Sequence, residues 1–369
     1  MFHKNNKINM VFAIVLGMGL IAETLAGPAE FTPLPELKPD QAKALLGKRL
    51  FYDKRLSGDD SVACVTCHTP DHGFSHPDAL SPAYEGSKHF RNSPSLINTV
   101  HKDAWLHDRR VSGNLEEVIR IMISESPLMN MDALLMVERL KQDPKYLQLF
   151  TAAELGEPTE ASVLSAIGEF LKTLTSRNAP IDTGKMSSDA KAGKALFSGK
   201  AGCSQCHGGA LFTDGKAYNT GVPENHDVFL DPLRHQSLIA YTKIVGLEGV
   251  ASLKRDPGVH AISQRSDKKD MGKFLTPSLR ELKHSAPYMH NGVFATLAEV
   301  VAFYNQGGGD DRHKDPRLKP LNLNEDEQKQ LVAFLLALSG EPLDGAAYVW
   351  TEPFPEDYPA ISNWRNQKN

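Results

Sequence analysis

The chain has 369 residues, enough for two domains that each bury a hydrophobic core. Hydrophobic residues make up 41% of it and charged residues 23%, a balance typical of globular proteins, which excludes a disordered or membrane-embedded chain. The formal net charge of −4 argues against nucleic acid as a partner.

The amino terminus has the pattern of a secretory signal peptide. Lys4 and Lys7 precede the apolar run 10–22, which is short for a membrane span, and small residues at 24–26 suit cleavage. An uncleaved amino-terminal anchor is the alternative. We therefore expect residues 1–26 to be removed and the mature protein, which has no further span, to reside in the periplasm.

Helical periodicity dominates the chain after a proline-rich lead-in, whereas strand signals are weak throughout. Asp40 can cap the first helix, and Thr296 with Glu299 forms a capping-box pattern before a later one. The sequence therefore predicts a mainly α fold with long connecting loops. The expected helical segments are 41–51, 115–122, 133–140, 161–174, 297–304 and 325–338.

The segment 64–68 reads C-V-T-C-H, the pattern required for covalent attachment of a c-type haem. Cys64 and Cys67 would form thioethers with the haem vinyl groups, and His68 would bind the iron. A redox dithiol and half of a zinc site are the alternatives for C-x-x-C. The histidine directly after the second cysteine argues against both.

A second copy, C-S-Q-C-H, occupies residues 203–207 and supplies Cys203, Cys206 and His207. All four cysteines of the chain fall in the two motifs, so none is left for a disulfide. A four-cysteine zinc site is the remaining alternative. We expect two covalently bound c-type haems.

The surroundings of the two motifs repeat as well. G-K-R-L-F at 47–51 precedes the first motif, and G-K-A-L-F at 193–197 precedes the second. A glycine and a phenylalanine follow each motif within a few residues. This duplication predicts two cytochrome-c-like haem domains, at 27–180 and 181–345, followed by a carboxy-terminal tail at 346–369.

With these motifs the chain resembles the bacterial di-haem cytochrome c peroxidases and their MauG-type relatives, from about residue 40 to residue 340. The resemblance implies that hydrogen peroxide binds at the His68 haem and that the His207 haem is six-coordinate and relays electrons. It also implies a calcium ion between the domains, held by the Asn92 side chain and the carbonyls of Ser285 and Pro287. The matching segments are Leu50–Asp53, Arg55–Ser57, Arg91–Leu96, Asp256–Gly258, Phe274–Arg280 and Ala286–Gly292.

In this family the sixth ligand of the second haem is methionine in the peroxidases and tyrosine in the MauG branch. Counted from Gly292, this chain has Tyr304 at that position. A phenolate is a hard anionic ligand that favours Fe(III), whereas a thioether favours Fe(II). The alternatives are that Tyr304 is a core aromatic residue, or that Met289 or His290 is the ligand. We expect Tyr304 to bind the iron.

The first haem departs from the family pattern on its open side. Tyr84 stands where some peroxidases have a distal histidine, so we expect a five-coordinate haem, with His89 as a loop or propionate contact. The family's distal glutamate, which moves a proton between the peroxide oxygens, corresponds to Met129 here. Glu125 lies four residues earlier and is the candidate replacement; an exposed loop carboxylate is the alternative.

A further departure concerns the segment between the two haems. The family usually has a tryptophan there, in the sequence W-D-G-R, whereas this chain has His107 at that position and Trp105 two residues earlier. A histidine is a poorer relay for electron transfer. We therefore expect altered coupling between the haems, with His107 as the candidate relay.

Together these features predict a periplasmic di-haem oxidoreductase. It would reduce hydrogen peroxide at the His68 haem and pass oxidising equivalents through the His207/Tyr304 haem to a protein substrate, as MauG does. One alternative is a conventional cytochrome c peroxidase supplied by a small electron-donor protein. A second is a non-catalytic electron-transfer cytochrome.

Overall fold

The computed structural model describes residues 31–84, 86–249 and 253–343. The predicted signal peptide and the predicted tail at 346–369 lie outside these ranges. Within them no helix combines the length and the apolar character needed to cross a membrane. The fold is mainly helical, as expected, and its strands are two-residue pairs. These are β1 (Ala104–Trp105) with β2 (Val111–Ser112), and β3 (Ala217–Tyr218) with β4 (Phe274–Leu275).

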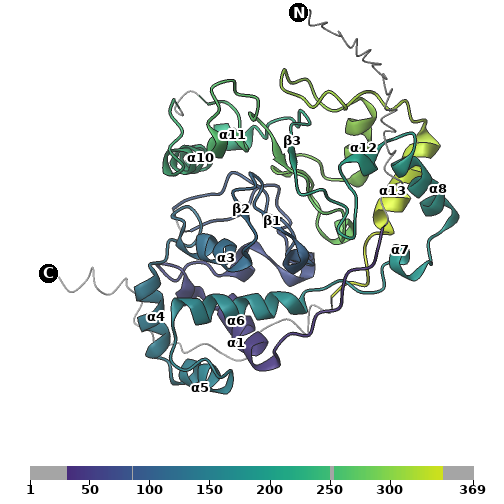
Figure 1. Ribbon diagram of the computed structural model, residues 1–369. Coiled ribbons are helices and arrows are strands. Elements are labelled where there is room, and N and C mark those ends of the chain that lie inside the picture. The colour runs from purple at the N-terminus through teal and green to yellow at the C-terminus, as the bar shows by residue number, and fades with distance from the viewer. Residues whose placement is uncertain (1–30, 85, 250–252, 344–369) are drawn as a thin grey trace, which may run out of the picture.

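The first haem motif belongs to a helical half built around two long helices that pack along each other, α1 and α6 (Figure 1). The α1 helix begins where Asp40 accepts hydrogen bonds from the N–H groups of Ala42 and Lys43, at 3.0 and 3.1 Å, as its sequence predicts. The helices of this half are α1 (Gln41–Tyr52), α2 (Cys64–Cys67), α3 (Leu115–Ser124), α4 (Ala133–Lys141), α5 (Pro144–Ala152) and α6 (Glu160–Thr173).

The second haem motif follows α8, which packs against the later helix α13 to form a similar pair. The predicted capping box is present at the start of α12, where Thr296 and Glu299 bond each other's backbone N–H groups. The helices of this half are α7 (Pro180–Thr183), α8 (Ser188–Ser198), α12 (Leu297–Asn305) and α13 (Glu325–Leu336).

The sequence repeat has a physical basis in how these two pairs pack. A Cβ atom on Gly47 would lie 1.9 Å from the carbonyl oxygen of Ala166 in α6. A Cβ atom on Gly193 would lie 1.9 Å from the carbonyl oxygen of Gln330 in α13. The repeated glycine thus lets each haem-bearing half bring two helices into backbone contact.

Each half has its own hydrophobic cluster, but each end of the described chain packs against the cluster of the opposite half. Phe31, from the lead-in, packs in the second cluster and stacks on Phe212 with ring centroids 4.5 Å apart. Leu343, near the carboxyl end, packs against the first cluster. In Figure 1 the lead-in runs from beside α13 across to α1. The domain boundary at residue 180 stays a prediction.

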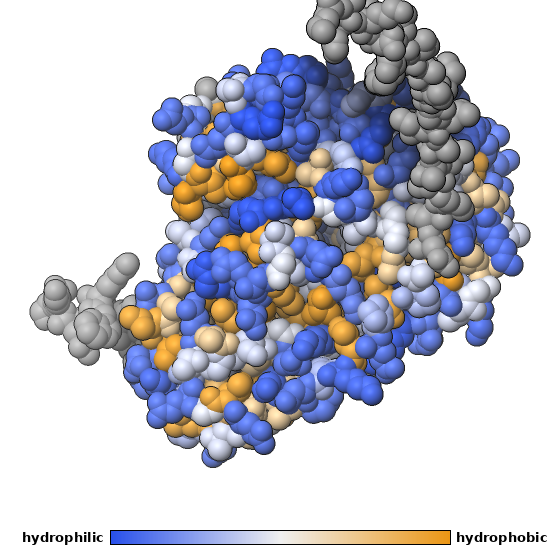
Figure 2. Space-filling model, viewed as in Figure 1, coloured by the Kyte–Doolittle hydropathy of each residue, from blue (hydrophilic) through white to orange (hydrophobic). Residues whose placement is uncertain are grey.

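A third hydrophobic cluster packs Leu80 and Phe90 of the first half against a helical segment that was absent from the expected helices, residues 227–249 and 253–263, which we call the cap. Its main helix, α10, starts at Asp231, whose side chain accepts from Leu233 N–H at 3.0 Å, with Pro232 in the first turn. Leu238 and Tyr241 of α10 pack against the first half. Figure 2 shows hydrophobic residues gathered along the boundary beneath this segment. The cap helices are α9 (Asp227–Leu230), α10 (Pro232–Ile244) and α11 (His260–Ser263).

Candidate haem and peroxide site

Both motif histidines are held in the orientation that iron ligation requires. His68 Nδ1 lies 3.0 Å from the carbonyl oxygen of Phe74, and His207 Nδ1 lies 2.9 Å from that of Phe212. A carbonyl oxygen only accepts, so each Nδ1 carries the hydrogen and each Nε2 lone pair is left for a metal. The phenylalanine that follows each motif therefore orients the histidine through its backbone.

The cysteines lie where thioether bonds to two separate haems can form. Cys64 and Cys67 are the first and last residues of α2, three apart, and so face the same side. Cys64 packs against the first hydrophobic cluster and Cys203 against the second. The two C-x-x-C pairs therefore do not converge on one four-cysteine zinc site.

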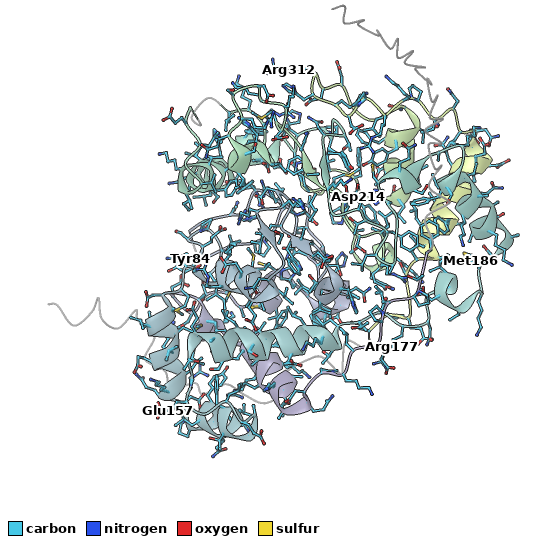
Figure 3. All side chains as sticks on the ribbon, in the orientation of Figure 1. Tyr84, Glu157, Arg177, Met186, Asp214 and Arg312 are labelled. Atoms are coloured by element: carbon cyan, nitrogen blue, oxygen red, sulfur yellow. The ribbon has the colours of Figure 1, made fainter. Side chains whose placement is uncertain are left out.

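A cavity of about 660 Å³ opens beside His68, large enough for a bulky cofactor. One wall carries the proximal groups Cys64, Cys67 and His68. Another part of the cavity wall is mostly apolar and is formed by side chains of α3 and α6. The cavity extends to the second half, where Asp214, labelled near the centre of Figure 3, is among its lining residues. It is the space that a haem bound to His68 would fill.

Lys102 tests whether this cavity suits a haem, which carries two propionates. Lys102 lines the cavity, and among the described residues no carboxylate or other side chain pairs with it. Burial lowers the pKa of this ammonium group to about 8. His101, its neighbour, also lines the cavity, and its buried Nε2 lacks a hydrogen-bond partner among the described residues. An anionic propionate supplies the partner that both groups need, so the site fits a haem.

We expect Lys102→Met to lower the reduction potential of the haem on His68. Removing a cation from a low-dielectric site favours the ferric state, which carries one more positive charge. A tenfold change in the relative stability of the two oxidation states corresponds to about 59 mV, and we expect a decrease of that order. Spectroelectrochemical titration measures it, with solvent-exposed Lys243→Met as the control. An unchanged potential would show that Lys102 is not a propionate partner.

The distal side of the cavity combines an apolar wall with one carboxylate. Met129, at the position of the family's glutamate, is buried in the first cluster and offers no proton. Glu125, the candidate replacement, follows the last residue of α3 and lines the same cavity. Its side chain is 18% exposed and pairs with Arg110 Nη2 at 2.8 Å. Burial raises the pKa of Glu125. Glu125 is therefore a cavity-wall carboxylate, not a solvated loop residue.

Of two other residues considered for this side, His89 is among the lining residues of the cavity and Tyr84 is not. His89 Nδ1 accepts from the backbone N–H of Arg91 at 3.1 Å. Burial lowers the pKa of His89 to about 3, so the ring is neutral. Tyr84 lies near the left edge of the molecule in Figure 3. The five-coordinate haem stays a prediction.

His107, not Trp105, makes the contact across the two halves. The His107 backbone carbonyl accepts from Leu275 N–H at 2.8 Å, and its Nε2 donates to the Asn92 carbonyl at 2.9 Å. Burial lowers its pKa to about 4, so the ring is neutral. Trp105 also lines the cavity, but its indole N–H donates to Thr99 O within the first half. The His107 ring lies 6.5 Å from that of His290.

Tyr304 lies on the last turn of α12, and desolvation is the main cause that raises its pKa to about 12. Cys203 and Cys206 of the second haem motif raise the pKa further, by smaller electrostatic effects. A side-chain hydrogen bond with Thr220 acts in the opposite direction. In the absence of a metal the phenol is thus neutral, and a ferric ion would be needed to remove its proton.

The predicted calcium ligands come from segments that the structure ties together. Asn92 N–H donates to the carbonyl of His290 at 2.8 Å, and His72 Nε2 donates to that of Ala286. The Asn92 amide nitrogen donates to the carbonyls of Asp78 and Ala79, both at 3.2 Å, which leaves its Oδ1 as an acceptor. Ser285 and Pro287 flank Ala286 in the tied segment. The ion itself stays a prediction.

Several cavity residues carry no local sequence signal. Lys102, Arg110 and Tyr241 line the cavity, yet none belongs to a haem motif. Tyr241 reaches it from the cap, and the dipeptide Asp231-Pro232 was the available sign of that helix. The other two follow only from the folded geometry.

The comparisons with known proteins agree with this architecture. The model of the family described as di-haem cytochrome c peroxidase matches residues 41–191. Cytochrome-c peroxidase IdrP2 of Denitromonas iodatirespirans is 44% identical over 346 residues, spanning 91% of this chain and 93% of the relative. Methylamine utilization protein MauG of Methylorubrum extorquens is 34% identical over 85% of this chain and 83% of its own.

A solved structure shows the same fold. The crystal structure of a MauG-like protein associated with microbial copper homeostasis matches with a TM-score of 0.69 and 27% identity, over 86% of this chain and 95% of that one. With two C-x-x-C-H motifs, two oriented histidines and relatives of this similarity, the chain belongs to the di-haem cytochrome c peroxidase family, oxidoreductases with two c-type haems that act on peroxide.

Proposed function

We propose that hydrogen peroxide is reduced on the His68 side and that oxidising equivalents pass through a second haem, held by His207 and Tyr304, to a protein substrate. Overall, one peroxide with two protons and two electrons gives two molecules of water. The observation that supports the proposal is a half-buried phenol, not a thioether, close enough to Cys203 and Cys206 to interact with them electrostatically. A phenolate ligand favours high oxidation states and so favours holding oxidising equivalents over accepting electrons from a weak donor.

The protein's own part in the peroxide step is proton transfer. A bound haem supplies an iron that coordinates peroxide and provides electrons. Glu125 takes the proton from one peroxide oxygen and returns it to the other, so that the leaving oxygen departs as water rather than hydroxide. The apolar wall around Met129 keeps water away from Glu125 and the peroxide, so that water does not exchange the proton during this transfer.

We expect Tyr304→Phe to change the ferric absorption spectrum and to raise the reduction potential of the second haem. Loss of an anionic oxygen ligand removes stabilisation of Fe(III), which corresponds to about 59 mV for each factor of ten. Absorption and magnetic circular dichroism spectra measure the change. Tyr288→Phe is the matched control, because Tyr288 packs in the same half and its hydroxyl donates to the Leu282 carbonyl. An unchanged spectrum in Tyr304→Phe would show that Tyr304 does not bind the iron of the second haem.

A conventional peroxidase is the second candidate, favoured because IdrP2, named a cytochrome-c peroxidase, is more similar to this chain than MauG is. Its electrons would come from a small donor protein. Stopped-flow absorption after one equivalent of peroxide, with and without a reduced cytochrome or copper protein, separates the two. Rapid reoxidation of the donor supports the peroxidase, and a long-lived oxidised protein supports transfer to a side chain of a partner.

The proposal includes an exported protein with a calcium ion. The pattern in residues 1–26 supports cleavage and a periplasmic location, which mass spectrometry of the exported protein tests. The position of Asn92 beside segment 285–290 supports calcium between the halves, which metal analysis before and after chelation tests.

A further inference from the structure

A buried row of alternating charges runs from the cap to the haem cavity. It begins at Asp256, whose two oxygens accept from Arg91 at 2.6 and 2.9 Å. Arg91 Nη1 also donates to Asp108 Oδ2, at 2.7 Å. Arg110 continues the row, donating from Nη1 to Asp108 at 2.8 Å and from Nη2 to Glu125 at 2.8 Å. The last member, Glu125, is the carboxylate of the row that lines the cavity, together with Arg91 and Arg110.

Asp108 fixes the guanidinium of Arg110. Its side chain is fully buried, and its Oδ2 accepts from Arg91, Arg110 and the Tyr241 hydroxyl, the last at 2.6 Å. Its Oδ1 accepts from the backbone N–H of Arg110 at 3.2 Å. The Tyr241 ring lies under the guanidinium, 5.1 Å from centroid to Cζ. Arg110 is therefore held on two sides, and only Nη2 is directed at Glu125.

The composition of the row leaves one negative charge in excess, because it has two guanidinium groups and three carboxylates. Arg91 lowers the pKa of both Asp108 and Asp256 against the effect of burial, so these two stay ionised. Burial raises the pKa of Glu125, while Arg110 and Arg91 lower it and Asp108 raises it. The position in the row that exchanges a proton is therefore the cavity end.

We propose that Arg110 is a positioning residue: its guanidinium, fixed by Asp108, holds the Glu125 carboxylate at the cavity wall and sets its proton affinity. The inference rests on the proposed acid–base role of Glu125. Through Tyr241 and Asp256 it makes the cap part of the peroxide site, although the cap lies more than 100 residues farther along the chain.

The helix α3, which ends just before Glu125, offers a control pair that is not fixed in this way. Arg120 and Glu117 pair on α3 at 2.5 Å, but their side chains are 43% and 37% exposed. An exposed pair of this kind contributes little and is screened by salt. Arg120→Gln thus removes a guanidinium from α3 without touching the row or the cavity.

The test measures fluoride binding to the ferric protein as a function of pH, together with the pH profile of the peroxide reaction. Fluoride bound in the cavity accepts a hydrogen bond from a protonated Glu125. A plot of fluoride affinity against pH therefore changes slope at the pKa of Glu125. Arg110→Gln removes the cation that favours the carboxylate, and we expect this transition to move up by about one pH unit or more, a tenfold change in affinity between the two pKa values. Arg110→Lys keeps the positive charge and should move the pH of this transition less. Arg120→Gln should not move it.

The possible outcomes separate this inference from the function on which it rests. Glu125→Gln should abolish the transition. If it does, and Arg110→Gln leaves the transition where it was, the positioning role is wrong while the role of Glu125 stands. If Glu125→Gln changes neither the fluoride profile nor the peroxide rate, the acid–base role itself is wrong. Should Arg110→Gln fail to fold or to bind haem, the Arg110→Lys shift decides.

Discussion

Glu125→Gln is expected to slow the reaction with hydrogen peroxide by about 10²- to 10⁴-fold, the usual contribution of a positioned acid–base group. Glutamine has nearly the same shape, and its carbonyl can still accept the hydrogen bond that Arg110 Nη2 donates to Glu125 at 2.8 Å. It cannot take up a proton, however, and the neighbouring wall residue Met129 offers no alternative. The loss should therefore fall on the chemical step and leave the resting structure intact.

Stopped-flow measurement of the second-order rate constant, on protein with matched haem content, tests this expectation. Glu117→Gln is the control, since Glu117 is an exposed glutamate of the adjacent helix α3 and is paired with Arg120. A rate within a factor of two of the unmodified protein would remove Glu125 from the mechanism. It would leave proton transfer to solvent or to another group, such as the cavity-lining His89 or His107.

Gly47→Ala and Gly193→Ala are each expected to destabilise the protein by about 3 kcal/mol, at the upper end of the usual cost of overpacking. The added methyl group would meet a backbone carbonyl oxygen at 1.9 Å in both cases, so the helices of the pair must separate. A backbone atom cannot rotate away as a side chain can. At about 2–4 °C for each kcal/mol, the midpoint of thermal unfolding should fall by about 10 °C.

Gly168 provides the matched control on α6. A Cβ atom there would meet nothing within 4 Å among the described residues, so Gly168→Ala should instead stabilise the helix by up to about 1 kcal/mol. Thermal unfolding of the three variants gives the comparison. Equal midpoints for Gly47→Ala and Gly168→Ala would show that the contact of α1 with α6 is looser than the structure has it.

Local patterns in the sequence were sufficient for the parts of the molecule that local chemistry determines. The haem motifs, the Asp40 cap and the Thr296–Glu299 capping box are signals within five residues, and the structure confirms the helices that the caps begin. The α10 helix was missed because its apolar residues do not follow one clear face, although Asp231-Pro232 marked its start.

The charged row around Arg91 could not be predicted from the sequence, for a different reason. Arg91 and Asp256 are 165 residues apart, and Tyr241 and Asp108 are 133 apart. A sequence shows which residues can pair, but only the packing of the cap on the first half selects these partners. Glu125 was identified as a candidate from its position near Met129, and its neighbour Arg110 could be recognised only once the fold had brought the two together.

The exchange of chain ends described above bears on how the two halves depend on each other. Phe31 belongs by sequence to the first half but stacks on Phe212, and the Arg280 guanidinium donates to the Thr32 carbonyl at 3.2 Å. Leu343, from the other end, seats on the first cluster. Each half thus contains a segment that the chain supplies from the other side of residue 180 or from its far end. Cutting the chain near residue 180 would therefore leave neither half with its complete hydrophobic cluster. Completion of both hydrophobic clusters therefore depends on segments from both ends of the described chain.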